Sequence, residues 1–142
     1  MTGHPVLTAL ADLNVLSPAD LDFIRRHGRS YRGIPLPSHI EPWRPGHCLD
    51  TADFLEEEGH GRFVRGWALR PGSRAPLMHA WVTADGAKAI DASWDNQVRC
   101  AYWGLDRRHE DTLRRLTDVV NEAIDERGRA SWYGSVFGGS FR

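Results

Sequence analysis

Three short segments of the chain carry residues that could together perform thiol chemistry. Gly46 and His47 precede a predicted helix that begins at Cys48, whereas His79 and Asp91 fall on two consecutive predicted strands. A cysteine attacks a carbonyl carbon as the thiolate, and a free thiol is mostly protonated at neutral pH. A histidine can take that proton, and a carboxylate can orient and stabilise the charged imidazole. The order predicts Cys48 as nucleophile, His79 as base and Asp91 as the residue that orients the base.

The position of Cys48 favours the thiolate. Apolar residues at helical spacing predict a helix over residues 48–58 that begins at Cys48. The unpaired N–H groups at the start of a helix stabilise negative charge. Gly46 lets the chain turn sharply into this helix. The alternative reading is that Cys48 is a small buried core residue, as free cysteines often are.

The loop between the two strands decides whether His79 and Asp91 meet. A two-residue loop, Asp85-Gly86, would place them on opposite faces of the sheet. A three-residue loop that adds Ala84 would place His79 directly opposite Asp91 on one face. The sequence permits both loops, and we predict the longer one because only that register assembles the triad.

Hydrophobic spacing and turn residues predict the elements around these residues. The expected fold class is α+β, in which the Cys48 helix packs on an antiparallel sheet and further helices lie at the N- and C-terminal ends. The proline-rich residues 33–46 are expected to form an ordered loop, either one wall of a groove or a plain surface connection. Helices are predicted over residues 5–14, 18–27, 48–58 and 106–127, with Gly128 ending the last, and strands over residues 62–69, 77–83, 87–93 and 101–103.

Length and composition limit the classes of function. The 142 residues are expected to form a single domain, and the net charge of -1 without a Lys/Arg cluster predicts no nucleic-acid partner. Neither a signal peptide nor a membrane span is recognised, so we expect a cytoplasmic protein with no membrane partner. Its two cysteines, Cys48 and Cys100, are then expected to be reduced; a disulfide between them is the alternative and would remove the nucleophile.

Further residues near the triad have two readings each. His47 is a candidate oxyanion donor or substrate contact, or else an exposed loop residue. Trp81 and Trp94 flank the site and would contact substrate or shield the imidazole, or else belong to the core. Cys100 has no comparable setting and is predicted to serve packing.

The order of Cys48, His79 and Asp91 resembles the transglutaminase-like branch of the papain-like cysteine enzymes. The patterns Gly-x-Cys, His-Ala-Trp and Asp-x-Ser-Trp, within residues 45–105, are similar to those of small bacterial and phage proteins of this type. The resemblance implies a papain-like core and a nucleophile, base and orienter in the order just given. It implies acyl transfer through a thioester without a cofactor. Papain has an upstream glutamine as oxyanion donor, whereas residues 29–47 contain neither Gln nor Asn.

Three functions fit these residues. The first is a cysteine hydrolase or acyltransferase whose open groove takes a peptide, a protein side chain or a small amide or thioester. The second is a non-catalytic binding module that uses the proline-rich loop and the aromatic tail, including Trp132 and Phe137. The third is a metal site of Cys48, His79 and Asp91 with or without His47, although paired C-x-x-C motifs are missing. The oligomeric state and the acyl acceptor stay open.

Overall fold

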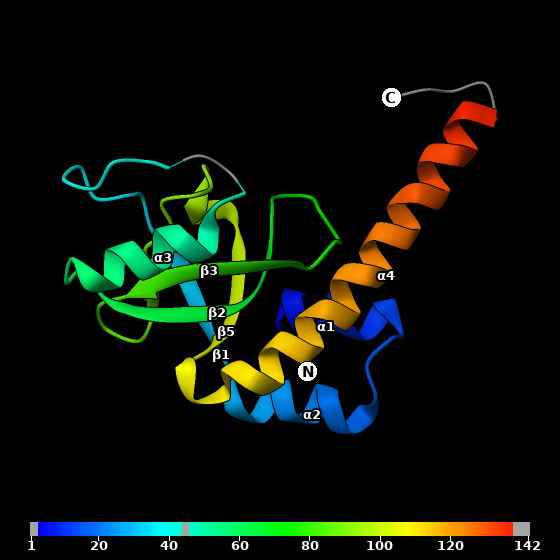
Figure 1. Ribbon diagram of the computed structural model, residues 1–142, viewed down its shortest axis with the longest axis horizontal. Helices are drawn as coiled ribbons and strands as arrows, with labels where there is room; N and C mark the ends of the chain where they lie inside the picture. The colour runs from blue at the N-terminus through cyan, green and yellow to red at the C-terminus, as the bar shows by residue number, and fades with distance from the viewer. Residues whose placement is uncertain (1–2, 44–45, 138–142) are drawn as a thin grey trace.

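A mixed sheet and four helices make up the fold (Figure 1). The computed structural model describes residues 3–43 and 46–137, with the backbone alone for residues 129–137. Within these ranges the predicted α+β class is confirmed. The helices are α1 (Pro5–Leu13), α2 (Pro18–His27), α3 (Cys48–Glu57) and α4 (Glu110–Phe137); the strands are β1 (Arg29–Gly33), β2 (Arg62–Leu69), β3 (Leu77–Thr83), β4 (Lys88–Ala89) and β5 (Ala101–Leu105); and single 3₁₀ turns span Gln97–Arg99 and Arg107–His109.

The two N-terminal helices begin at capped positions. The Ser17 hydroxyl accepts a 3.0 Å hydrogen bond from the Asp20 N–H, and Pro18 occupies the first position of α2. In α1 the imidazole of His4 accepts from the N–H of Val6. These caps satisfy N–H groups that have no partner inside a helix, which is why the predicted helix starts are confirmed.

The strands pair in the order β3-β2-β5-β1-β4. The pairs β3–β2, β2–β5 and β5–β1 are antiparallel, but β1 and β4 run parallel. The prediction of an antiparallel sheet is therefore corrected to a mixed sheet. The parallel pair depends on β1, which the sequence analysis did not identify because Tyr31 is the single large apolar residue of that strand.

The sheet curls until its two edges meet. Val82 at the end of β3 and Ile90 just after β4 exchange backbone hydrogen bonds of 3.1 and 2.8 Å. Two paired glycines on the inner strands β2 and β5 lie where a side chain would clash. A Cβ on Gly66 would lie 2.1 Å from the Trp103 carbonyl oxygen, and a Cβ on Gly104 would lie 2.7 Å from the Trp81 ring. The curl brings residues on β3 beside residues that follow β4.

The predicted strand over residues 87–93 is wrong in its second half. Only Lys88–Ala89 form β4, and Ile90 makes an isolated bridge. The chain then turns because the Asp91 carboxylate accepts hydrogen bonds from the N–H groups of Ser93 and Trp94. Such local bonds to a side chain compete with strand pairing.

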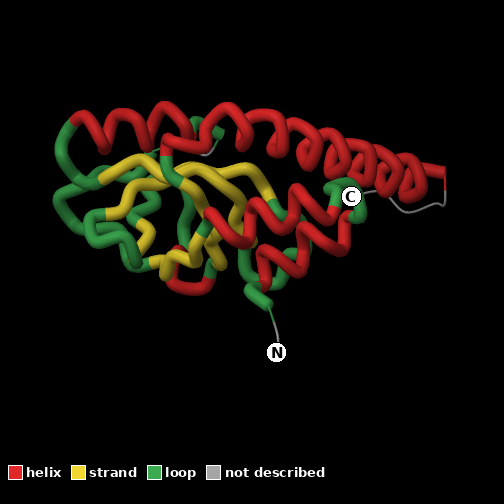
Figure 2. Tube along the Cα trace, turned by 90° about the horizontal axis from the view of Figure 1, so that it is seen from below, coloured by secondary structure: helices red, strands yellow, loops and turns green. Residues whose placement is uncertain are grey.

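Helices cover the sheet in two groups. Helix α3 packs through Ala52 and Leu55 on the outer side of β3, against Ala80 and Val82. The other three helices, α1, α2 and α4, pack around Trp67 and the apolar residues near it. Figure 2 shows α4 running along the sheet and extending beyond it toward its C-terminal end.

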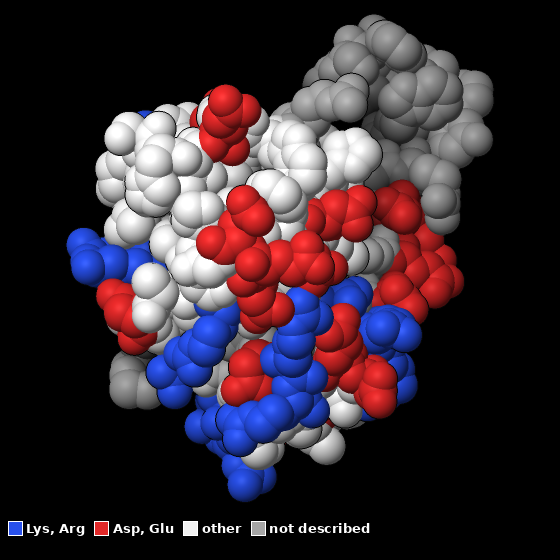
Figure 3. All heavy atoms as spheres, turned by 60° about the vertical axis from the view of Figure 1, so that its left-hand side comes forward, with Lys and Arg blue, Asp and Glu red and all other residues white. Residues whose placement is uncertain are grey.

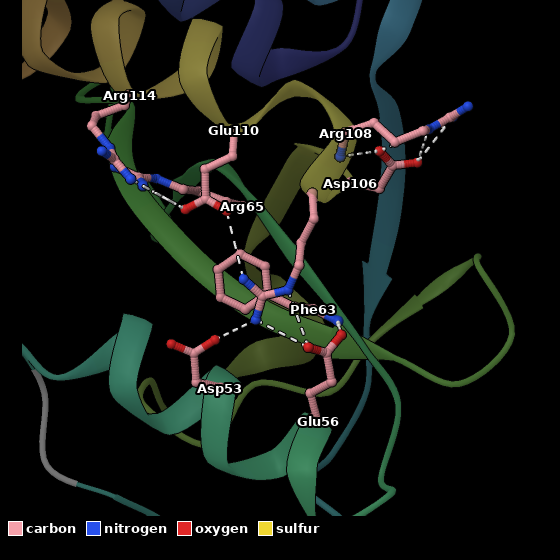
Figure 4. A network of polar contacts seen from close by, with 9 residues as sticks. Asp53, Glu56, Phe63, Arg65, Asp106, Arg108, Glu110 and Arg114 are labelled. Atoms are coloured by element: carbon pink, nitrogen blue, oxygen red, sulfur yellow. Dashed lines mark hydrogen bonds and ion pairs between the residues drawn. The ribbon is translucent and has the colours of Figure 1, made fainter.

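A polar network fixes α3 relative to the start of α4 (Figure 4). The Arg107 guanidinium contacts Asp53 and lies 3.0 Å from Glu56, both on α3. The same guanidinium sits 3.9 Å from the centre of the Phe63 ring, and Glu56 accepts a 2.7 Å bond from the Phe63 N–H. Arg65 on β2 pairs with Glu110 on α4 at 3.4 Å. Helix α3, which begins at Cys48, is therefore attached through Asp53 and Glu56 to β2 and to the turn before α4.

Helix α4 runs further than the sequence predicts. Gly128 was expected to end it, yet the helix continues to Phe137. A glycine inside a helix costs about 1 kcal/mol relative to alanine, which a long helix can absorb. The side chains of the aromatic tail, including Trp132 and Phe137, lie outside the described residues. Among the described residues, the helices include none long and apolar enough to span a membrane.

Candidate active site

The imidazole of His79 lies inside the curled sheet. It is 2% exposed and stacks on the Trp94 indole with 4.0 Å between ring centroids and 26° between planes. Trp94 thus covers one face of the imidazole and shields it from water, as one reading of the sequence predicts.

The Asp91 carboxylate orients the His79 ring through a hydrogen bond from Nε2. The His79 Nε2–H donates a 2.9 Å hydrogen bond to Asp91 Oδ2, since a carboxylate can only accept. The Tyr102 hydroxyl donates to the same oxygen at 2.8 Å, and the N–H groups of Ser93 and Trp94 donate to Oδ1. Asp91 is 1% exposed, so these four donors offset the cost of burying its charge.

The strand register differs from the predicted one. The Val82–Ile90 bridge places Trp81, not His79, opposite Asp91, so the direct pairing expected from a three-residue loop is wrong. The difference of two positions along the strand keeps side chains on the same face, because side chains alternate with a period of two. His79 and Asp91 therefore meet diagonally.

Cys48 is the first residue of α3 and is partly buried. Gly46 before it has φ of +93°, a left-handed conformation that glycine adopts without strain. Cys48 and His79 line the same hollow, and the imidazole lowers the pKa of the Cys48 thiol. Because Nε2 is bonded to Asp91, Nδ1 is the ring nitrogen left for the thiol. The structure brings Cys48, His79 and Asp91 together in the predicted order.

The electrostatics of the cluster favour an ion pair. Burial alone would raise the pKa of the Cys48 thiol, but the hydrogen bond and the charge of His79 outweigh it, so the pKa lies below that of an ordinary cysteine. Burial alone would lower the pKa of His79, yet the hydrogen bonds to Asp91 and Cys48 raise it to about 9. The attraction between a thiolate and an imidazolium contributes to both shifts, and Asp91 contributes further to the raised pKa of His79.

Cys100 has a different environment. It is 9% exposed, its sulfur donates to the Asn96 carbonyl, and burial raises the pKa of its thiol. Both cysteines are free thiols in this structure. This setting agrees with the packing role expected for Cys100.

An open groove leads away from the thiol. A hollow of about 270 Å³ contains Cys48 and His79 together with Arg70, Trp94 and Asn121. Arg70 and Trp94 also line the next hollow, which reaches Trp43 in the proline-rich loop. Beyond it, a third hollow holds the exposed pair Trp43 and Phe54, whose ring centroids are 5.6 Å apart.

The three candidate substrate or oxyanion residues have different positions. His47 is exposed and makes no capping bond with its side chain, although its carbonyl accepts from Thr51. Trp81 is 1% exposed and packs edge-on against Tyr31 and Tyr102. Of its two predicted roles, the structure therefore favours that of a core residue. Neither residue lines the hollow at Cys48; Trp94 does.

Sequence reasoning missed three residues of this region. Tyr102 on β5 reaches Asp91, and its place on a predicted strand could have indicated an inward position. Arg70 follows β2 and stacks on Trp94, with 4.7 Å from its guanidinium carbon to the ring centre. Asn121 comes from α4, and no local pattern connects that helix to Cys48.

Metal binding was the third function considered. Among the side chains of residues 3–43 and 46–128, no group of three or more His, Cys, Asp and Glu residues is arranged to hold a metal ion.

No protein-family model, curated protein or solved structure matches this chain. The resemblance to papain-like enzymes therefore depends on the short motifs alone, and the geometry of the site carries the functional argument.

Proposed function

We propose that this protein is a cysteine-dependent acyl-transfer enzyme on a core of the papain-like, transglutaminase-like type. One observation carries the proposal: the buried 2.9 Å contact between His79 and Asp91, in which the imidazole lines the same hollow as Cys48. A histidine that served packing alone would need neither a buried carboxylate nor a thiol at the rim of a groove.

In the first step the Cys48 thiolate attacks the carbonyl carbon of an amide, ester or thioester. A C–S bond forms and the carbonyl electrons move to oxygen. The tetrahedral intermediate then collapses, the bond to the leaving group breaks, and the His79 imidazolium gives its proton to that group. Asp91 keeps Nε2 occupied, so the proton transferred comes from Nδ1.

In the second step water or an amine resolves the thioester. The neutral His79 now takes a proton from the incoming nucleophile as that nucleophile bonds to the acyl carbon. The C–S bond breaks and returns Cys48 as thiolate beside the imidazolium. If water is the acceptor the reaction is hydrolysis, and if an amine is the acceptor the reaction is acyl transfer.

The developing oxyanion needs hydrogen-bond donors near Cys48. The N–H of Cys48 is one, because the first N–H groups of a helix have no partner inside it. The side-chain amide of Asn121 in the same hollow is the second donor that we assign. It comes from the C-terminal helix rather than from the segment before the cysteine.

The shape of the groove indicates the substrate class. The hollow at Cys48 opens toward Arg70 and then toward Trp43, so an extended chain fits better than a small enclosed molecule. Trp43 is 47% exposed and offers an apolar contact, while Arg70 offers a positive charge. A peptide or protein segment with an acidic and an apolar side chain matches this surface.

An activated ester such as p-nitrophenyl acetate tests the proposal without knowledge of the natural substrate. We expect rapid release of p-nitrophenol and an acetyl group on Cys48, found by peptide mass spectrometry. Cys48→Ala and His79→Ala should each abolish the reaction, and Cys100→Ala should leave it unchanged. Acetylation of Cys48 and Cys100 at equal rates would overturn the proposal.

A second candidate function is a non-catalytic binding module. The exposed contact between Trp43 and Phe54 beside the proline-rich loop favours it. Under this reading Cys48→Ala would leave peptide binding in the groove intact and the wild-type thiol would react as an ordinary cysteine. Measuring the thiol pKa separates the two functions.

A further inference from the structure

A second hollow lies at the other ends of the central strands, away from Cys48. It has a volume of about 240 Å³ and is built from the start of β1, the start of β2 and the end of β3. Figure 3 brings this side of the molecule forward and shows Lys and Arg side chains on the lower part of the face, with Asp and Glu side chains among them. The lining residues include His27, Arg29, Tyr31, Arg62 and Arg108.

The guanidinium groups of Arg29 and Arg62, which both line the hollow, approach one point beside Gly86. A Cβ on Gly86 would lie 3.4 Å from Arg62 Nη2 and 3.5 Å from Arg29 Nη1. Within the described part of the chain, neither arginine forms an ion pair. Arg29 donates only a long bond of 3.4 Å to the Gly86 carbonyl. Two positive charges held close together without a counter-charge repel each other, so an anion between them would be stabilised.

The remaining polar groups of the hollow add to this preference. Among the described residues its only lining carboxylate is Asp106, which is already paired with Arg108 at 3.0 Å. Burial raises the pKa of the Tyr31 hydroxyl, on which the charges of Arg29, Arg62 and Asp106 also act. A phenol hydroxyl beside two arginines can donate a further hydrogen bond to an oxyanion.

The walls also have an apolar part, from Phe63, Val64 and Leu105. Arginine pairs favour phosphate because the planar fork of donors matches its oxygens, and phosphate carries nearly two charges at neutral pH. We propose that this hollow binds a small phosphomonoester, whose phosphate lies between Arg29 and Arg62 and whose organic part contacts the apolar wall. The site is separate from the Cys48 groove and does not depend on its chemistry.

The test is a titration with inorganic phosphate and then phenyl phosphate at constant ionic strength, followed by NMR of the backbone amides. We expect saturable shifts at Gly86 and Gly104, with phenyl phosphate binding more tightly than inorganic phosphate. Arg29→Gln and Arg62→Gln should each weaken binding about tenfold or more. Cys48→Ala should bind as the wild type does.

Arg32→Gln is the matched control, because Arg32 is exposed on the same strand and does not line the hollow. The Arg32→Gln substitution removes one positive charge, as Arg29→Gln does, and should leave the affinity for phenyl phosphate unchanged. Equal weakening in the Arg29 and Arg32 variants would show a general charge effect and overturn the site, as would shifts spread over the surface without saturation. Melting temperatures of the variants confirm that each is folded.

Discussion

The Tyr102 hydroxyl and the His79 imidazole donate to the same oxygen of Asp91, at 2.8 and 2.9 Å. Burial and the Asp91 charge hold the pKa of Tyr102 above its ordinary value, so the phenol stays protonated and remains a donor. Tyr102 thus fixes the carboxylate that orients the candidate base, although it does not line the hollow at Cys48.

Replacement of Tyr102 by Phe should destabilise the protein without removing the thiol chemistry. The buried carboxylate would lose one donor, which costs about 1.5–3 kcal/mol for a bond to a charged group. Urea unfolding measures this loss, and iodoacetamide labelling should show a Cys48 that still reacts within about tenfold of the wild-type rate. A Tyr102→Phe protein as stable as wild type would show that Asp91 does not need this bond.

Cys48 should be alkylated at lower pH than Cys100. The pKa of Cys48 is lowered by His79 and the pKa of Cys100 is raised by burial, so thiolate forms first at Cys48 as pH rises. Peptide mass spectrometry after iodoacetamide pulses at a series of pH values gives the midpoint for each thiol. Cys48→Ala and Cys100→Ala proteins identify which thiol each midpoint belongs to. Coincident midpoints would contradict the ion pair.

Asp91→Asn should lower the pKa of His79, which is raised to about 9 in the intact site. An amide cannot stabilise the imidazolium as a carboxylate does, so the ring loses its proton at lower pH and the pKa of Cys48 rises in turn. NMR titration of the His79 ring protons measures the change. Esterase activity should fall about tenfold or more, and a His79 pKa that does not move would count against the assigned role of Asp91.

Gly104→Ala should destabilise the curled sheet. Its Cβ would lie 2.4 Å from Val64 Cγ1 and 2.7 Å from the Trp81 ring, inside the core. Such overpacking costs about 1–3 kcal/mol. Gly128→Ala is the control: nothing lies within 4 Å of its Cβ, and in the helix it should stabilise the protein by about 0.5–1 kcal/mol. Thermal unfolding of the two variants compares these opposite effects.

The sequence by itself determined the local parts of this protein. The caps and breakers around Pro18 and Gly28 defined α2, and alternating apolar residues gave the bounds of β2 and β3. The start of α3 at Cys48 also followed from helical spacing. These features depend on residues within a few positions of each other, and so a periodic pattern is enough to find them.

Tertiary structure decided how the local parts meet. The contact between His79 and Asp91 depends on the curl of the sheet and on a register that the loop residues alone left ambiguous. Asn121 lines the hollow at Cys48 because of the position in which α4 packs. Such contacts join residues far apart in the chain, and their energy comes from burial and pairing of whole elements, which no local pattern encodes.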